Sequence, residues 1–220
     1  MPNLTAGQKT LLKNDIAANT AVIPAGQPWT NAFANVAVQN VPSTPDGNAT
    51  LAGWYNQIAV PDFVVWRNLP MDTILSLITY AAMTPADAVP SVTTLGSNPT
   101  SAQQATYDNQ IATLGIWRAR SLSCQGKQFN LQNLTIGRTS APMKQANYRA
   151  ALQDCLTNLP AGASGASIAA NWVGVRDAAK FLALYSEKVF ATGTGTTATP
   201  ADLGYEGTIT ADDVEAARNS

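Results

Sequence analysis

The sequence predicts a mainly α protein. Apolar residues recur at spacings of three and four in most segments, several of these segments begin at a capping residue, and no pair of alternating segments is joined by a hairpin turn. Hydrophobic residues make up 45% of the 220 residues, which is enough for a core. We expect a helical, bundle-like body over residues 1–190, with a loop insertion at about 85–99. An extended C-terminal arm with a short terminal helix is expected over residues 191–220.

Two helices are predicted near the N-terminus. Thr5 is a suitable cap for a helix that runs to about Asn19, and Leu4 occupies the staple position before the cap. The pattern over Trp29–Val38 predicts a second helix, although its valine-rich end also suits a strand.

A turn cluster at residues 42–47 separates these from a third helix. Asp46 or Asn48 is expected to cap this helix, and Pro61 to end it. The apolar run Phe63–Trp66 is too short for its periodicity to distinguish a helix from a strand.

The middle of the chain predicts helices on both sides of a loop. Pro70 suits the first position of a helix over Met71–Met83. The segment Pro85–Pro99 contains three prolines and a glycine and almost no charge, so we expect a projecting loop.

A long helix is predicted over Ser101–Gln125, with a break at Gly126 before a continuation over Lys127–Ile136. Its apolar positions are Tyr107, Ile111, Leu114, Trp117 and Leu122.

Pro142 then suits the first turn of a further helix, and residues 159–165 form a loop after it.

The C-terminal third predicts a long buried helix over Ile168–Phe190, because its apolar sector is wide. The threonine- and glycine-rich strap over residues 191–200 has nothing to bury and is expected to be mobile or extended when free. Thr210 and Asp213 have capping-box spacing at the start of a short terminal helix. About nine residues do not hold a helix alone in water, so this tail docks on its own body, docks on another chain or is a frayed end.

The composition argues against catalysis. The chain contains no histidine, which removes Ser-His-Asp and Cys-His catalysis and most catalytic zinc sites. The segment Gly193–Thr196 lacks the lysine of a phosphate-binding loop. The two cysteines, Cys124 and Cys155, suit buried thiols. We therefore expect no enzymatic activity, no cofactor and no metal.

Charge and hydropathy also narrow the possible partners. Charged residues make up 12% of the chain, about half the usual share, and the formal net charge is -1. Low charge suits a surface that partners cover, and the scattered basic residues argue against nucleic acid as the main ligand. The start of the chain does not resemble a signal peptide and no apolar run reaches the length of a bilayer span, so we expect a cytoplasmic protein without membrane contact.

Five residues are the candidates for contacts with a partner. Tyr55 and Tyr205 adjoin polar or glycine-rich sequence, and large aromatic residues anchor interfaces. Ile209 and Val214 are the apolar anchors of the terminal segment, and Arg218 lies in its last turn.

Several segments resemble structural proteins of tailed bacteriophages, in particular the head-to-tail connector or adaptor family. They are Leu4–Asn19, Gly53–Gln57, Glu187–Gly195, Tyr205–Ile209 and Asp213–Asn219. The resemblance covers both ends of the chain and little of residues 70–153.

The resemblance implies a structural protein of the virion neck, assembled in the host cytoplasm. Its subunits would form a homo-oligomeric ring under the portal protein, with the C-terminal arm reaching into a neighbouring protein and contacts to tail or nozzle proteins. DNA would pass through the ring without sequence-specific binding, which the small net charge suits. Two other hypotheses remain open: another phage structural protein, such as a head-decoration or tail-completion protein, and a helical enzyme that works without histidine.

Overall fold

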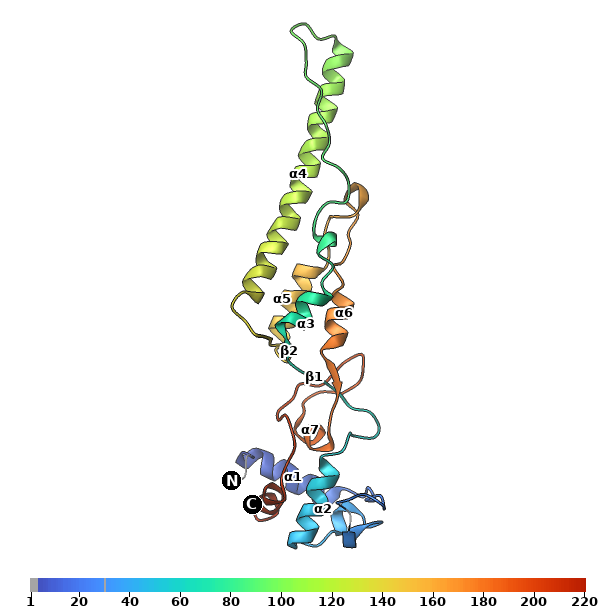
Figure 1. Ribbon diagram of the computed structural model, residues 1–220, viewed down its shortest axis with the longest axis vertical. Coiled ribbons are helices and arrows are strands. Elements are labelled where there is room, and N and C mark those ends of the chain that lie inside the picture. Colours follow the sequence, from blue (N-terminus) through green and yellow to red (C-terminus); the bar gives the residue numbers. More distant parts are fainter. Residues whose placement is uncertain (1–3, 30) are drawn as a thin grey trace. The chain divides into compact units, whose positions relative to one another are not determined.

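The computed structural model describes residues 4–29 and 31–220, and this part of the chain is mainly α (Figure 1). It contains eight α-helices, several 3₁₀ turns and two antiparallel sheets of two short strands each. The predicted mainly α class is therefore confirmed.

The chain divides into two compact units. Unit 1 comprises Met1–Arg67 and Lys180–Ser220, and unit 2, Asn68–Ala179, is inserted between these segments. The expected division at residue 190 is not the one observed, because residues on both sides of it share the core of unit 1.

Unit 1 combines the two ends of the chain. Its helices and strands are α1 (Ala6–Ala18), η1 (Asn31–Phe33), η2 (Val38–Asn40), α2 (Pro45–Tyr55), β1 (Val64–Trp66), β4 (Lys180–Leu182), α7 (Tyr185–Phe190) and α8 (Ala211–Arg218). Helix α8 packs against both α1 and α2. The strands β1 and β4 are antiparallel, with Val65 opposite Phe181.

The first helix forms as predicted, whereas the second does not. Thr5 caps α1 in a capping box with Gln8. The helix expected over Trp29–Val38 is wrong, because this segment pairs with residues 21–23. The Ile23 amide donates to the Val36 carbonyl at 3.0 Å, and the Asn35 amide donates to the Ile23 carbonyl at 2.8 Å. In the described residues of this segment, the helical structure is limited to two short 3₁₀ turns.

The cap of α2 is Thr44, and neither Asp46 nor Asn48 has this role. The Thr44 hydroxyl accepts from the Gly47 amide at 3.1 Å, and Pro45 takes the first helical position. The helix ends at Tyr55, well before Pro61. The capping preference of a hydroxyl immediately before proline explains the shift.

The long helix predicted over Ile168–Phe190 is wrong. This segment consists of α6 (Trp172–Ala178), β4 and α7. The apolar residues Phe181 and Leu182 pair with β1, so partners distant in sequence override a helical pattern that is continuous in the sequence.

The strap after α7 is held against β1 and does not hang free. The Val64 amide donates to the Gly195 carbonyl at 2.7 Å, and Thr192 pairs with Asp202. Gly195 has a φ of +67°, and a Cβ there would lie 2.2 Å from a ring carbon of Phe63. Glycine is therefore required at this position by both conformation and space.

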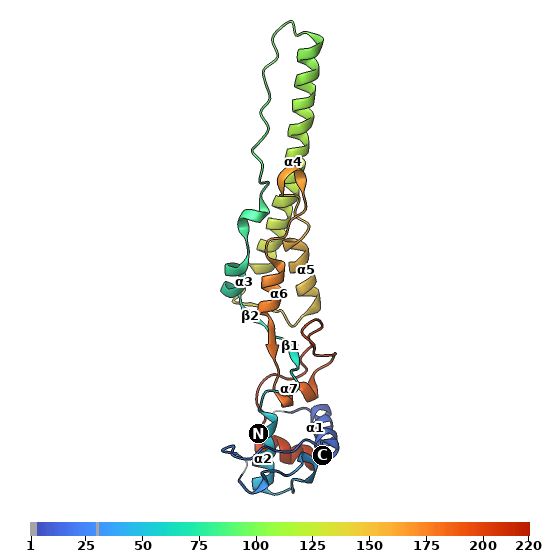
Figure 2. The ribbon, with the colours of Figure 1, turned by 90° about the vertical axis from the view of Figure 1, so that its right-hand side faces the viewer.

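Unit 2 contains one long helix and several short elements. They are β2 (Leu69–Pro70), α3 (Met71–Leu77), η3 (Tyr80–Met83), α4 (Ser101–Thr135), β3 (Ser140–Ala141), α5 (Ala146–Leu156), η4 (Ala163–Gly165) and α6. Strand β2 pairs with β3. Within this unit, α5 and η3 pack against α4 (Figures 1 and 2).

Two boundaries in unit 2 differ from the prediction. The helix expected over Met71–Met83 ends at Leu77, and Pro70 is its cap residue rather than its first residue. Pro142 lies before α5, in a turn closed by a hydrogen bond of 2.9 Å from the Gln145 amide to the Pro142 carbonyl.

Helix α4 is continuous over its 35 residues, so the predicted break at Gly126 is wrong. Thr100 caps the helix in a capping box with Gln103. A single glycine within a helix costs only about 1 kcal/mol relative to alanine, which is too little to interrupt a capped helix of this length.

Replacement of Gly126 by alanine is expected to raise the free energy of unfolding by about 0.5–1 kcal/mol. A Cβ at this position meets no other atom of the chain within 4 Å, so the gain in helix propensity is not offset by a clash. Chemical denaturation checks this. Gly195→Ala is the contrasting variant and should lower the stability, because a Cβ at that position would clash with Phe63. A loss of stability in Gly126→Ala would contradict the expectation.

Candidate interaction surfaces

The five residues proposed for partner contacts lie together in unit 1, where contacts within the chain occupy them. Ile209 and Val214 are buried in the core, between α8 and the helices α1 and α2. Tyr205 packs edge-to-face on Phe190, and its hydroxyl donates to the Thr208 carbonyl at 2.6 Å. Ile209, Val214 and Tyr205 therefore stabilise unit 1 through contacts within the chain.

Arg218 connects α8 to the segment before α2. Its guanidinium donates to the carbonyls of Pro42 and Val41, each at 2.7 Å, and to the side-chain oxygen of Asn48 at 2.9 Å. Burial lowers the pKa of Arg218. Arg218 therefore holds α8 against the segment before α2 within unit 1.

Tyr55 is fully buried, and its hydroxyl donates to an oxygen of Asp15 at 2.6 Å. Burial, together with the negative charge of Asp15, raises the pKa of the Tyr55 phenol. Ionisation would place two negative charges next to each other in a desolvated site, so the folded protein keeps the phenol protonated.

Stability is expected to fall as the pH rises above about 10, because Tyr55 loses its proton in the unfolded chain and keeps it in the folded one. Below about pH 10 both states are protonated and the contribution is fully present. Burial also raises the pKa of Tyr148 and Tyr205, so both phenols contribute to the same loss of stability at high pH. Denaturation midpoints measured from pH 8 to pH 11 check this. Tyr55→Phe should decline less steeply, and an equally steep decline would contradict the assignment.

The most enclosed charged group among the described residues is Glu187 on α7, which is 0% exposed. One guanidinium nitrogen of Arg67, Nη2, lies 2.8 and 2.7 Å from its two carboxylate oxygens. The same oxygens accept from the amides of Gly207 at 3.1 Å and Leu184 at 2.9 Å. This carboxylate therefore joins the residue after β1, the start of α7 and the segment before α8.

None of these groups forms a recognisable reactive site. Among the residues that the structure describes, no cluster of three or more His, Cys, Asp or Glu side chains could hold a metal ion. Burial raises the pKa of both Cys124 and Cys155, which disfavours the reactive thiolate. In residues 4–29 and 31–220, no helix has the length and apolarity needed to cross a membrane.

The segment between η3 and α4 contains no helix or strand over residues 85–99, as predicted, and it runs beside α4 (Figures 1 and 2). Asp87 attaches the start of this segment to α4. The Asp87 carboxylate accepts from Arg120 at 2.6 and 2.7 Å, and the Asp87 carbonyl accepts from the Trp117 indole at 3.0 Å. The hydrogen bonds from Arg120 lower the pKa of Asp87. Further along, the Thr93 amide donates to Gln110 at 2.9 Å.

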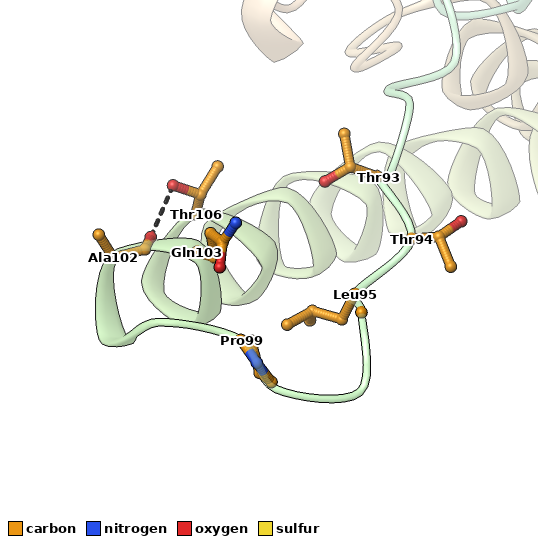
Figure 3. A pocket seen from close by; sticks show the side chains of 8 residues that line it. Thr93, Thr94, Leu95, Pro99, Ala102, Gln103 and Thr106 are labelled. Carbon is orange, nitrogen blue, oxygen red and sulfur yellow. Dashed lines mark hydrogen bonds between the residues drawn. The ribbon is translucent and has the colours of Figure 1, made fainter.

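A small cavity of about 380 Å³ lies at the tip of this segment (Figure 3). The Leu95 side chain points toward the start of α4, and Thr94 points away from it. No charged residue occurs from Ala88 to Tyr107, so the tip offers only hydroxyls, amides and methyl groups. It therefore has no group for acid–base chemistry or for binding an ion by charge.

A larger groove lies between η3 and the C-terminal half of α4. Its volume is about 560 Å³, and none of its lining residues is charged. The lining consists of Leu75, Tyr80, Met83, Thr84, Gln128, Leu131, Gln132 and Thr135. The Gln128 amide donates to the Met83 carbonyl at 2.7 Å and holds η3 beside α4. We call this the η3 groove.

Helix α4 also exposes a row of large apolar side chains, formed by Ile111, Leu122, Phe129 and Ile136. Leu122, Phe129 and the cap residue Ile136 are 67%, 63% and 67% exposed. Spacings of seven and eleven residues return to almost the same side of a helix, so these residues form one line, which we call the outer row. The buried positions Cys124 and Leu131 lie on a different side.

The outer row was not among the features predicted from the sequence. Ile111 and Leu122 were grouped with Leu114 and Trp117 as apolar positions of the predicted helix, although the structure exposes the first two and partly buries the others. The seven-residue spacing of Leu122, Phe129 and Ile136 was the available signal. A break at Gly126 would have divided it.

No protein-family model, curated protein or solved structure matches the chain.

Proposed function

We propose that the protein is a structural component of a tailed-bacteriophage virion, a head-to-tail connector that forms a homo-oligomeric ring between the portal protein and the tail. In this role it is assembled in the host cytoplasm, contacts portal and tail or nozzle proteins, and has no catalytic activity. DNA passes through the ring without sequence-specific recognition.

The proposal rests on the agreement between the segments that carry the resemblance and one folded unit of the chain. The five segments that resemble connector proteins are scattered between residues 4 and 219, yet all belong to unit 1. They correspond to α1, the end of α2, α7 with the strap, the Tyr205 turn and α8, and residues from most of them share one core. A likeness that follows a folded unit supports common ancestry of that unit better than a likeness of isolated segments.

Two features of the described surfaces support a structural role. The chain has little charge, and α4 exposes a row of large apolar residues, both of which suit surfaces that other chains cover. The buried carboxylate Glu187 is saturated by hydrogen bonds within the chain, so it is a structural group rather than a reactive one.

Unit 2 is then an insertion in the connector-like unit 1, since the resemblance covers little of residues 70–153. An extended C-terminal arm that reaches a neighbouring protein would require α8 to leave the core. We therefore propose that contacts with portal or tail proteins use exposed residues, and that Ile209 and Val214 stabilise the subunit.

Cryo-electron microscopy of the virion that carries this protein tests the proposal. The expected result is a ring of density for this chain at the vertex, between portal and tail. Density spread over the capsid shell would instead show a head-decoration protein, and density at the far end of the tail would also contradict a connector.

A binding measurement with purified proteins gives a second test. The full chain should co-sediment with assembled portal protein and not with capsid shells that lack a portal. Equal binding to both would contradict a specific place at the portal vertex.

A further inference from the structure

The outer row of α4 is large, apolar and uncovered by the described part of the chain. Its residues Leu122, Phe129 and Ile136 extend over about 20 Å of helix, at about 1.5 Å per residue. Arg118 is exposed one helical turn before Leu122, whereas two other nearby charged residues are engaged elsewhere in unit 2. Arg120 pairs with Asp87, and the ammonium of Lys127 donates to the carbonyls of Asp154 and Thr157. From Leu122 to Ile136, the exposed line therefore contains no charged side chain.

Gly126 lies between Leu122 and Phe129 on the exposed part of the helix, and a side chain there would meet nothing within 4 Å. The fold of the chain itself therefore gives no reason for a glycine at this position. A neighbouring chain that approaches the helix closely would give one, because glycine allows close backbone contact.

The η3 groove is complementary to the outer row. It is uncharged, and its volume of about 560 Å³ can accept an aromatic ring together with an aliphatic side chain. Met83 and Leu131 provide buried apolar walls, and Tyr80, which is 52% exposed, stands at its edge. Tyrosine and phenylalanine are typical anchors of protein interfaces.

The row and the groove also lie at the same level of α4. Phe129 is flanked in the sequence by Gln128 and Leu131, which line the groove from another side of the helix. Subunits of a closed ring are related by rotation without translation along the axis. In a ring whose axis is parallel to α4, neighbouring copies are not shifted along the helix. Phe129 of one copy can then reach the η3 groove of its neighbour only if Phe129 and the groove are at the same height on α4.

We propose that the outer row of one copy docks in the η3 groove of a second copy, with Phe129 inserted between Tyr80 and Leu131. The two surfaces differ, so the contact is heterologous and each copy uses one of each. The closure of these contacts into a ring rests on the function proposed above, whereas the contact itself rests only on unit 2.

Native mass spectrometry and sedimentation of the full chain test the contact. The wild-type chain should assemble beyond a monomer at micromolar concentration. Phe129→Asp should weaken association about 30-fold or more, as expected for the loss of an anchoring aromatic residue. Ile116→Asp is the matched control, because Ile116 is 65% exposed on α4 outside the outer row. It should assemble as the wild type does.

A mixing experiment tests the heterologous geometry. Tyr80→Asp damages the groove and leaves the row intact, whereas Phe129→Asp does the reverse. Each variant alone should remain monomeric. An equimolar mixture should form a one-to-one dimer and stop there, because only one intact pair of surfaces is available. Circular dichroism of both variants should match the wild type, as the substituted side chains are exposed.

Three results would overturn the inference. They are a wild-type chain that stays monomeric, a Phe129→Asp variant that assembles normally, and a mixture that forms no heterodimer. A Tyr80→Asp variant that still dimerises would show row-to-row pairing and would also overturn it. These outcomes are independent of the virion location, so a connector could be shown by microscopy while this contact fails, or the reverse.

Discussion

Glu187→Gln is expected to lower the free energy of unfolding by about 3–5 kcal/mol, the usual cost of removing one partner of a buried ion pair. The substitution keeps the size of the side chain, so the loss does not come from a cavity. It removes the charge that Arg67 faces, and it replaces one accepting oxygen with an NH₂ group. That group would meet the amide of Gly207 or Leu184, both of which now donate to the carboxylate.

Urea denaturation of the wild type and the variant measures this effect. Glu206→Gln provides the matched control, because Glu206 lies 4.0 Å from the same arginine and its side chain is 42% exposed. An exposed pair contributes at most about 1 kcal/mol, so this variant should remain close to the wild type. Similar losses in both variants would show that the enclosure of Glu187 has no special importance.

Truncation after Gly207 is expected to unfold unit 1. It removes Ile209, Val214 and Ala217, which are at most 2% exposed, together with the three hydrogen bonds of Arg218. Loss of a single large buried aliphatic side chain costs about 2–5 kcal/mol, and a whole domain has only about 5–15 kcal/mol of stability. The sequence alone predicted an arm outside a body of residues 1–190, and loss of such an arm would leave the body folded.

Hydrogen exchange measured along the chain tests this expectation. Amides of α1 and α2 should lose their protection in the truncated protein, whereas those of α5 in unit 2 should keep it, since α8 packs on α1 and α2. Full protection of α1 and α2 after truncation would mean that the tail contributes little to the core.

Single substitutions on α8 give a milder form of the same test. Val214→Ala should cost about 2 kcal/mol, because two buried methyl groups are lost. Glu215→Ala, on the exposed side of the same helix, should change stability by less than about 0.5 kcal/mol.

The sequence by itself determined the features that depend on neighbouring residues. The mainly α class, the capped starts at Thr5 and Thr210 and the irregular segment at 85–99 follow from hydroxyl caps, helical spacing and clustered prolines. The capping box of Thr210 with Asp213 forms as the spacing predicted, with the Asp213 amide donating to the Thr210 hydroxyl at 3.2 Å. These interactions span three or four residues, so the local sequence contains all that they need.

Only the tertiary structure decided the features that depend on distant partners. The apolar pattern from Ile168 to Phe190 suits a helix, yet Phe181 and Leu182 form a strand because Val64 and Val65 lie opposite them, more than 110 residues earlier. The sequence predicted an extended arm for the terminal segment, yet Val214 is buried because α1 and α2 pack against α8. Exposure of Leu122 and Phe129 has the same origin, since which side of a helix is covered depends on what packs against it. Burial and strand pairing are properties of the assembled chain, and their energies exceed the local preferences of about 1 kcal/mol per residue or less that the sequence displays.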